Sequence, residues 1–446
     1  MSSTSNAHAE FQGMQSALAE ALAFVVREKP DDPIDAIGRR LLSRSSKAES
    51  SPLDDEEARK LEKPIVNGET AVALALDLYG LEVVPGSLKD LDSYDDRNFY
   101  FRGTKAREEL ALPADAHTVE GADGTFHFVL KVHNGVESLE PGFIEAQNQA
   151  MAALREAGVW CPRALPSRDG ALIAFAPLPL SSGVVRNHAI RCLPFKPAGL
   201  MGGVVATTGL LRDVGVITAK VSKALASFEH PATHRTFMWD LAQTLAVRPL
   251  LTHLSSERRT LIGSVLDEFE TLVLPSVPKL RTTVIHGDIN DQNVLVGPAG
   301  AADGERCVVG VIDFGDMCHT WMVNEIAIAA AYAVIALHYD RPEGAPSVDE
   351  MPSLGEVPAA VAIVSAYASQ MEAQGMALSE AEWSVLPTLI ACRIAMSLCI
   401  GAYSSAKDPT NEYLKLTLLP GLTALQRLRA TPVDELLVAL KSGSTP

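Results

Sequence analysis

The chain has 446 residues, and the 47% that are hydrophobic supply more core than one typical domain needs. Its formal net charge of −17 and the lack of a basic run argue against a nucleic-acid-binding protein, which commonly presents a basic face. The six cysteines are scattered and form no C-x-x-C pair, which disfavours a disulfide framework or a zinc site. The longest apolar run, 326–337, is too short to cross a bilayer. We therefore expect a cytoplasmic protein with small-molecule or protein partners, and no nucleic-acid or membrane partner.

The N-terminal region is predicted to form a small helical hairpin. Residues 1–10 are small and polar and are expected to be disordered. Residues 11–46 have apolar side chains at helical spacing on both sides of a break, where Asp32 and Pro33 suit the start of a second helix. The run ALAFVVREKPDDPIDAIGRRLL resembles the docking and dimerisation hairpin of the Dpy-30 and RIIα families. That resemblance implies a homodimer that binds an amphipathic helix of an anchoring partner; the alternative is a hairpin packed on its own chain.

A globular part is predicted to follow a linker. Residues 47–63 are polar and charged, with little apolar periodicity, and are expected to form that linker. Apolar patterning then predicts helices over 69–81 and 143–158 and strands over 98–101, 126–133, 172–180 and 189–195.

From about residue 199 the pattern becomes mostly helical, apart from a hairpin-like segment over 293–314. A strand-rich stretch followed by a helical one indicates an α+β fold with two lobes. We expect a β-rich N-lobe over 64–195 and a helical C-lobe over 196–446, preceded by the small hairpin.

The strongest motif reads H-G-D-x-x-x-x-N followed by I-D-F-G, at 286–293 and 312–315. Asp288 is the candidate catalytic base, because a carboxylate can accept the proton of a substrate hydroxyl during phosphoryl transfer. Asn293 and Asp313 offer amide and carboxylate oxygens, the ligands that Mg²⁺ prefers. A single aspartate would more often cap a turn, but this combination at this spacing predicts a magnesium-dependent kinase.

This motif resembles that of the protein-kinase-like superfamily in its small-molecule form, the aminoglycoside and choline kinases. The resemblance implies GTP or ATP as co-substrate, a supporting role for His286, and an N-lobe lysine paired with a glutamate. Lys131 lies in an otherwise apolar strand and is the candidate lysine. Glu145 starts the next helix and is the expected partner, with Glu137 and Glu140 as rivals.

The loop that covers the phosphates departs from the G-x-G-x-x-G pattern. The segment before Lys131, residues 91–99, is rich in Asp and Asn, which favour a tight turn. We expect Arg97, Asn98 or backbone N–H groups to meet the phosphates. Cys192 and Leu193 belong to the segment expected to join the lobes and to contact the nucleotide base through backbone groups.

Five further segments resemble the hydroxylysine kinase family over residues 64 to about 435. They are 78–101, 145–159, 228–241, 311–334 and 391–414. The resemblance implies transfer to the 5-hydroxyl of 5-hydroxy-L-lysine, with GTP as the usual donor. The alternatives are another amino alcohol (an aminoglycoside, choline or homoserine) or an anchored pseudokinase scaffold.

Hydroxylysine has two ammonium groups and one carboxylate, so its pocket needs acidic or aromatic side chains and a cation. The candidates for the ammonium groups are Trp239, Asp240, Asp316, Trp321, Glu325 and Tyr403. Arg393, in an apolar helix, is the candidate for the carboxylate, because a buried arginine usually needs an anionic partner. Each of these residues has a structural alternative, as a core side chain, a helix cap or half of an internal ion pair.

Overall fold

The computed structural model describes residues 52–105, 112, 124–298, 306–340, 354–409 and 417–444. The chain divides into two compact units, residues 1–58 and 59–446. The expected hairpin at 11–46, with its dimerisation and docking, lies outside the described residues. Helix α3 (Pro52–Leu61) occupies most of the expected linker.

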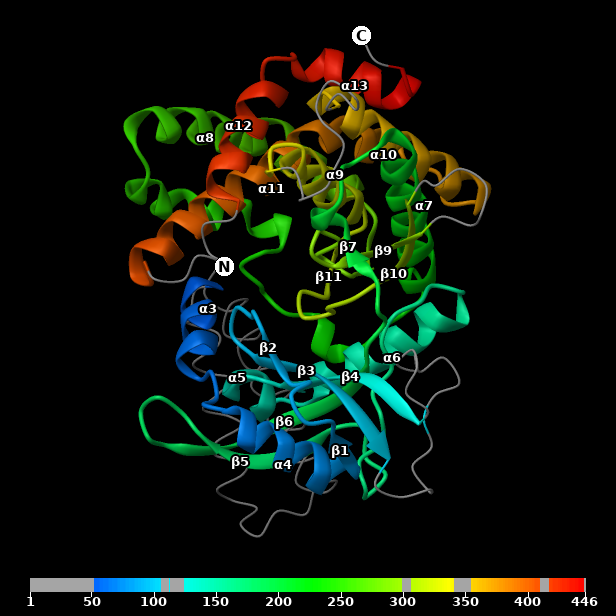
Figure 1. Ribbon diagram of the computed structural model, residues 1–446. Coiled ribbons are helices and arrows are strands. Elements are labelled where there is room, and N and C mark those ends of the chain that lie inside the picture. The colour runs from blue at the N-terminus through cyan, green and yellow to red at the C-terminus, as the bar shows by residue number, and fades with distance from the viewer. Residues whose placement is uncertain are drawn as a thin grey trace, which may run out of the picture. The chain divides into compact units, whose positions relative to one another are not determined.

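An antiparallel sheet forms the first lobe of residues 59–446, at the lower end of Figure 1. Its strand order is β1-β3-β4-β6-β5, and β2 pairs with β3. The strands are β1 (Leu81–Val83), β2 (Lys89–Leu91), β3 (Arg97–Lys105), β4 (Thr125–Val132), β5 (Ala174–Pro179) and β6 (Val185–Pro194). The four strands expected from the sequence are therefore present, with shifted ends.

Alternation along β4 separates a core face from a polar face. Phe128, Leu130 and Val132 are buried in the core of the lobe, beneath helix α4 (Gly68–Tyr79). Since successive side chains of a strand point to opposite faces, Lys131 emerges on the other side. Helices α5 (Gly135–Leu139) and α6 (Gly142–Glu156) follow β4.

The passage between the lobes is short. Phe195 still bonds to the sheet, because its N–H donates to His127 O over 2.9 Å. The next strand, β7 (Gly199–Leu200), already pairs with β9 (Val294–Pro298) of the second lobe. Strand β10 (Arg306–Val311) pairs antiparallel with β9, as the expected hairpin requires, and β8 (Thr282–Ile285) pairs with β11 (Cys318–Trp321).

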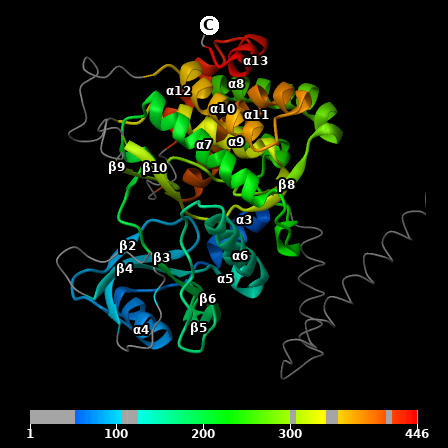
Figure 2. The ribbon, with the colours of Figure 1, turned by 90° about the vertical axis from the view of Figure 1, so that its right-hand side faces the viewer.

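Helices make up most of the second lobe, and Figure 2 shows α7, α9, α10 and α11 packed close together beside the hairpin of β9 and β10. The longer helices are α7 (Thr208–Leu225), α8 (Ser256–Glu268), α9 (Val323–Ala336), α10 (Glu356–Ala373), α11 (Glu380–Lys407), α12 (Leu418–Leu428) and α13 (Val433–Ser442). The short helical segments are η1 (Met201–Gly203), η2 (Pro231–Thr233), η3 (Leu241–His253), η4 (Phe269–Val273) and η5 (Leu274–Lys279).

Helix α11 is the one helix in the described part of the chain that is long and apolar enough to cross a membrane. However, 89% of its most apolar stretch is buried inside the protein, and core helices of soluble proteins pass the same test. Its length and apolar character are therefore those of a core helix, and this helix carries Arg393 into the site.

Candidate active site

Asp288 lies at the centre of a set of donors that fix its carboxylate. Asn290 and Asn293 donate to Oδ2 over 2.9 and 2.8 Å, and Arg393 donates to Oδ1 over 3.0 Å. Burial raises the pKa of Asp288 and the charge of Arg393 opposes that rise. The side chain still has 20% of its surface exposed, so a hydroxyl group can reach it. This is the arrangement that a general base requires.

A buried glutamate holds the loop from behind. Glu325 accepts hydrogen bonds from the N–H groups of His286 and Gly287, over 2.7 and 3.1 Å. Its side chain is fully buried on α9, and burial raises its pKa to about 7. The prediction that Glu325 contacts an ammonium group of the acceptor is therefore wrong, because its carboxylate is enclosed and engaged by the backbone.

His286 supports the loop as a neutral imidazole. Its Nδ1 accepts from the N–H of Asp288 over 3.3 Å, and its Nε2 donates to Ile312 O over 3.2 Å. Burial lowers its pKa to about 4. The ring thus joins the Asp288 loop to the chain just before Asp313.

Gly287 is required by both conformation and space. Its φ of 80° lies in the left-handed region, and a Cβ there would meet Asp316 O at 2.6 Å. The absence of a side chain lets the Asp288 loop and the chain at Asp316 touch.

Asn293 and Asp313, the two expected magnesium ligands, come from adjacent strand ends. The N–H of Ile312 donates to Asn293 O over 2.9 Å, which puts the next residue, Asp313, beside Asn293. Asp313 has φ 63°, a strained value for a residue with a side chain, and 46% of that side chain is exposed. Because the Asn293 amide nitrogen bonds to Asp288, its Oδ1 remains for a cation. One amide and one exposed carboxylate oxygen fit Mg²⁺.

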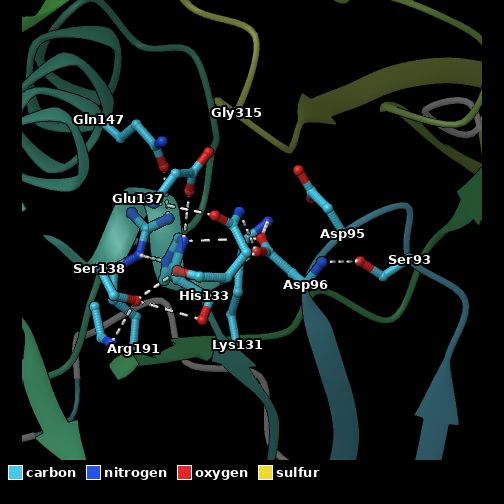
Figure 3. Close-up of polar contacts among 12 residues, drawn as sticks. Ser93, Asp95, Asp96, Lys131, His133, Glu137, Ser138, Gln147, Arg191 and Gly315 are labelled. Atoms are coloured by element: carbon cyan, nitrogen blue, oxygen red, sulfur yellow. Dashed lines mark hydrogen bonds and ion pairs between the residues drawn. The ribbon is translucent and has the colours of Figure 1, made fainter. Parts of the chain in front are cut away.

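Lys131 extends from the sheet towards Asp96 (Figure 3) and also approaches Asp313. Its Nζ lies 3.0 Å from Asp96 Oδ2 and 3.5 Å from Asp313 Oδ1. Burial opposes the charge of Lys131, but these two carboxylates raise its pKa above the usual value. The expected pairing with Glu145 is wrong: Glu145 is exposed on α6, and Asp96 of the phosphate-facing turn takes its place.

The rival Glu137 is buried in the same cluster but binds other groups (Figure 3). It accepts from His133 Nδ1 over 2.9 Å and pairs with Arg59 Nη2 over 2.5 Å. Arg59 Nε also pairs with Asp95 Oδ2 over 2.7 Å. An arginine from the expected linker thus connects the turn at 95–96 to helix α5.

Asn98, Lys131 and Arg191 form a polar row across β3, β4 and β6. They are directly opposite one another in register, so their side chains share the face away from α4. Asn98 Oδ1 is buried and has no hydrogen-bond partner among the residues that the structure describes, which suits a nucleotide contact. Arg97 points to the other side and pairs with Asp90, so the structure does not bring it to Lys131.

Cys192 and Leu193 lie within β6 and do not form the connection between the lobes. Cys192 is fully buried, and its carbonyl accepts from Leu165 N over 2.8 Å. Leu193 is half-buried opposite Val129. The prediction that Cys192 and Leu193 join the lobes is wrong, because residues 195–198 form the connection instead. The contact of Cys192 and Leu193 with the base through backbone groups stays a prediction.

Arg393 reaches the site with both terminal nitrogens engaged. Besides Asp288 it donates to Trp239 O over 2.5 Å, and its Cζ lies 5.1 Å from the centre of the Trp239 ring. The residue is 1% exposed. Arg393 therefore positions the Asp288 carboxylate, and Trp239, which is half-buried, lies beside Arg393.

Three other acceptor candidates have structural roles or lie elsewhere. Asp240 is buried and accepts from Ala242 N, Thr320 Oγ1 and Asn324 Nδ2, so it caps η3. Trp321 is buried, stacked 6.2 Å from Phe269. Tyr403 lies ten residues beyond Arg393 on α11, a rise of about 15 Å, and its ring contacts His253. The structure does not bring these three to Asp288.

Asp316 is the one remaining acidic candidate, and it lies beside Asp288. It is half-buried, and burial together with the charge of Asp288 raises its pKa well above the usual value. Arg235 is a further cation at this point, since it donates to Gly315 O over 2.6 Å.

Comparison with known proteins decides the family. A model of the phosphotransferase enzyme family, the APH family, matches residues 94–350, more than half of the chain. The chain belongs to this family. Hydroxylysine kinase of Xenopus laevis is 30% identical to this phosphotransferase over 376 residues, which cover 82% of this chain and 90% of that relative.

Two solved structures share the fold of this phosphotransferase. An amicoumacin kinase superposes with a TM-score of 0.54 at 14% identity, covering 85% of this chain and 97% of its own. A microcompartment-associated aminopropanol kinase gives 0.52 at 18% identity, with 85% and 99% covered. At these identities the two structures show the fold alone. The family match and the hydroxylysine kinase relative indicate a kinase that transfers a phosphoryl group from a nucleotide to a hydroxyl group of a small molecule.

Sequence reasoning missed three residues of this phosphotransferase: Asp96, Arg59 and Arg235. Asp96 carried a signal, because the Asp95–Asp96 pair stands where a phosphate-covering loop was expected. Arg59 and Arg235 carried none, since each lies in a polar stretch where an arginine is ordinarily exposed.

Proposed function

We propose that this phosphotransferase is a magnesium-dependent kinase of 5-hydroxy-L-lysine that uses GTP or ATP and acts in the cytoplasm. The single observation that carries the transfer is the Asp288 carboxylate, fixed between Arg393 and Asn293 and still partly exposed. The choice of acceptor is supported by the similarity to hydroxylysine kinases over most of the chain.

The transfer itself is a direct displacement. The acceptor hydroxyl gives its proton to Asp288, its oxygen forms a bond to the γ-phosphorus, and the bond from phosphorus to the leaving diphosphate breaks. Arg393 and the two asparagine amides keep the carboxylate aimed during this step. A carboxylate with a raised pKa is also a stronger base.

The nucleotide is bound from the other side. Lys131, held by Asp96 and Asp313, is placed to bind phosphate oxygens, and Asn98 Oδ1 offers an acceptor on the same face. Asn293 and Asp313 would hold Mg²⁺, which, when bound, neutralises the charge of the phosphates.

Acceptor recognition rests on Asp316 and Trp239. Asp316 is the carboxylate next to the base that accepts no hydrogen bond from any described residue, although the charges of Arg393, Arg235 and Arg59 act on it. An ammonium group beside it would satisfy its charge, and the Trp239 ring offers an aromatic face to a second cation.

The experiment that tests this function is release of nucleoside diphosphate, with GTP and ATP each tried against 5-hydroxylysine, lysine, homoserine, choline and kanamycin. We expect turnover with hydroxylysine and none with lysine, because only the former has the acceptor oxygen. Turnover with another acceptor alone would keep the kinase and overturn the substrate.

A second proposal concerns residues 11–46 and rests on their sequence. We propose that they form a homodimer that docks an amphipathic helix of an anchoring protein. Deletion of residues 1–48 should leave an active monomer in sedimentation; a truncated protein that is still dimeric would exclude the hairpin as the interface.

A further inference from the structure

Arg235 is a half-buried cation held between two aromatic rings beside the Asp313–Asp316 turn. Its Cζ lies 3.9 Å from the centre of the Phe143 ring and 4.1 Å from that of Phe237. Such stacking leaves the edge of the guanidinium plane free to form hydrogen bonds. Nη2 uses part of that edge to donate to Gly315 O.

The rest of that edge is incompletely satisfied. Arg235 Nε is buried without a hydrogen-bond partner, and Arg235 forms no ion pair within the described ranges. Burial and the nearby charge of Arg59 lower its pKa, although an arginine stays charged at any physiological pH. The carboxylates of Glu137 and Asp316 are near enough to favour its charge, but neither forms an ion pair with it among the described residues. A desolvated cation without a direct anionic partner is costly, which indicates an anionic ligand.

Two anions come to this site, the phosphates and the acceptor's carboxylate. The phosphates are attributed to Lys131 and the Mg²⁺ ligands, on the Asp313 side of the turn. Arg235 contacts the turn at Gly315, next to Asp316, which is the acceptor side. Arg393, expected from the sequence to bind the carboxylate, is instead engaged with Asp288 and Trp239.

We propose that Arg235 is the specificity-determining residue that binds the carboxylate of the acceptor. This inference rests on the proposed function and adds a division of charge recognition to it. Asp316 takes an ammonium group and Arg235 the carboxylate, on either side of the hydroxyl that faces Asp288. An amino acid is then preferred over the corresponding amine.

The test compares 5-hydroxy-L-lysine with its decarboxylated counterpart, 1,5-diaminopentan-2-ol, in the wild type, Arg235→Met and Arg235→Lys. Wild type should prefer hydroxylysine in kcat/KM by roughly 10- to 100-fold, the range of one charge-assisted, two-point contact. Arg235→Met should lose that preference, with the amine used as before, and Arg235→Lys should restore part of it. Arg248→Met is the matched control, since Arg248 is a partly exposed arginine that pairs with Asp267 and Glu270.

Each other outcome has a distinct meaning. Equal losses on both acceptors would show that Arg235 only supports the Gly315 turn, and a rise in the nucleotide KM would assign it to the phosphates; both overturn the inference. If Arg235→Met fails to fold, equal use of the two acceptors by wild type would still overturn it. If the wild-type enzyme turned over neither acceptor but did turn over a different one, the proposed function itself would be overturned.

Discussion

The two halves of the active site are held together in different ways. On the C-lobe side, two asparagines within five residues of Asp288 and Arg393, 105 residues later, hold its carboxylate. Hydrogen bonds to Glu325 and Ile312 hold the loop that carries it. On the N-lobe side, Lys131 depends on Asp96, 35 residues earlier, and Glu137 on Arg59, 78 residues earlier. One half is a loop held mainly by hydrogen bonds, with a single ion pair to Arg393, and the other is a network of several charges.

Because of this difference, substitutions in the two halves should have different effects. The hydrogen bonds that Asn290, Asn293 and the neutral His286 form around the loop do not require a second charged partner. Buried ion pairs depend on every partner being charged, because a charge left alone in the interior is strongly destabilising. We therefore expect substitutions in the loop to abolish phosphoryl transfer. Substitutions in the network should weaken nucleotide binding and narrow the pH range in which the protein is stable.

The largest effect is expected from Asp288→Asn. The amide cannot accept the hydroxyl proton, so kcat should fall by roughly 10²- to 10⁴-fold while nucleotide binding is retained. Stopped-flow binding of a fluorescent nucleotide and steady-state turnover measure the two separately. Asp267→Asn, on the surface of α8, is the control; a Asp288→Asn enzyme with full kcat would remove the assigned base.

Asp96→Asn tests the charge network on the N-lobe side of the site. Lys131 then keeps only Asp313 as a partner, so the nucleotide KM should rise and kcat/KM fall by about 10- to 100-fold, with a smaller change in kcat. Asp169→Asn, exposed in the same lobe, should behave as wild type. Unchanged nucleotide kinetics in Asp96→Asn would mean that Asp96 does not position Lys131.

Glu325→Gln tests the support behind the loop. Glutamine has one oxygen where two N–H groups need acceptors, so one buried donor is left unsatisfied, and the free energy of unfolding should drop by about 1–3 kcal/mol. Denaturant titration gives this value, with Glu372→Gln on the exposed side of α10 as the control. An equally stable variant would show that the loop does not need the second acceptor.

The smallest effect at neutral pH is expected from Arg59→Met, and it depends on pH. Burial opposes the charge of Glu137, but Arg59 and the hydrogen bond from His133 lower its pKa from 4.5 to about 2. A depressed carboxyl pKa contributes stability above pH 4.5 that is lost as the pH falls towards 2. Wild type should therefore exceed the variant by about 1–2 kcal/mol at pH 7 and by less at pH 3.5.

Unfolding free energies at pH 7, 5 and 3.5 measure this convergence. Arg248→Met, which removes a partly exposed arginine, should differ little from wild type at all three. A constant gap between wild type and Arg59→Met would mean that Arg59 stabilises the protein by packing on Phe237 instead of by charge.

Sequence patterns predicted the two-lobed fold, because strands and helices each have a characteristic local spacing of apolar residues. Lys131 was recognisable as a single charge in an apolar strand. The spacing of Asp288, Asn293 and Asp313 marked them as a group, because a tight loop and a short hairpin bring residues at that spacing together. The same reasoning failed for Glu145, which starts the expected helix but points to water.

Sequence reasoning also failed for Glu325 and Asp240, whose carboxylates accept hydrogen bonds from backbone N–H groups. The sequence does not distinguish such a carboxylate from one that faces a ligand. Sequence alone was enough to predict the order of the lobes and the residues of the Asp288 loop. In that loop the interacting residues are only a few positions apart, so the backbone can adopt few conformations. Only the contacts in three dimensions reveal that Asp96 pairs with Lys131, that Arg393 holds Asp288 and that Arg235 forms no ion pair among the described residues. The reason is that ion pairing and burial depend on distance in space, which spacing along the chain does not define beyond a few residues.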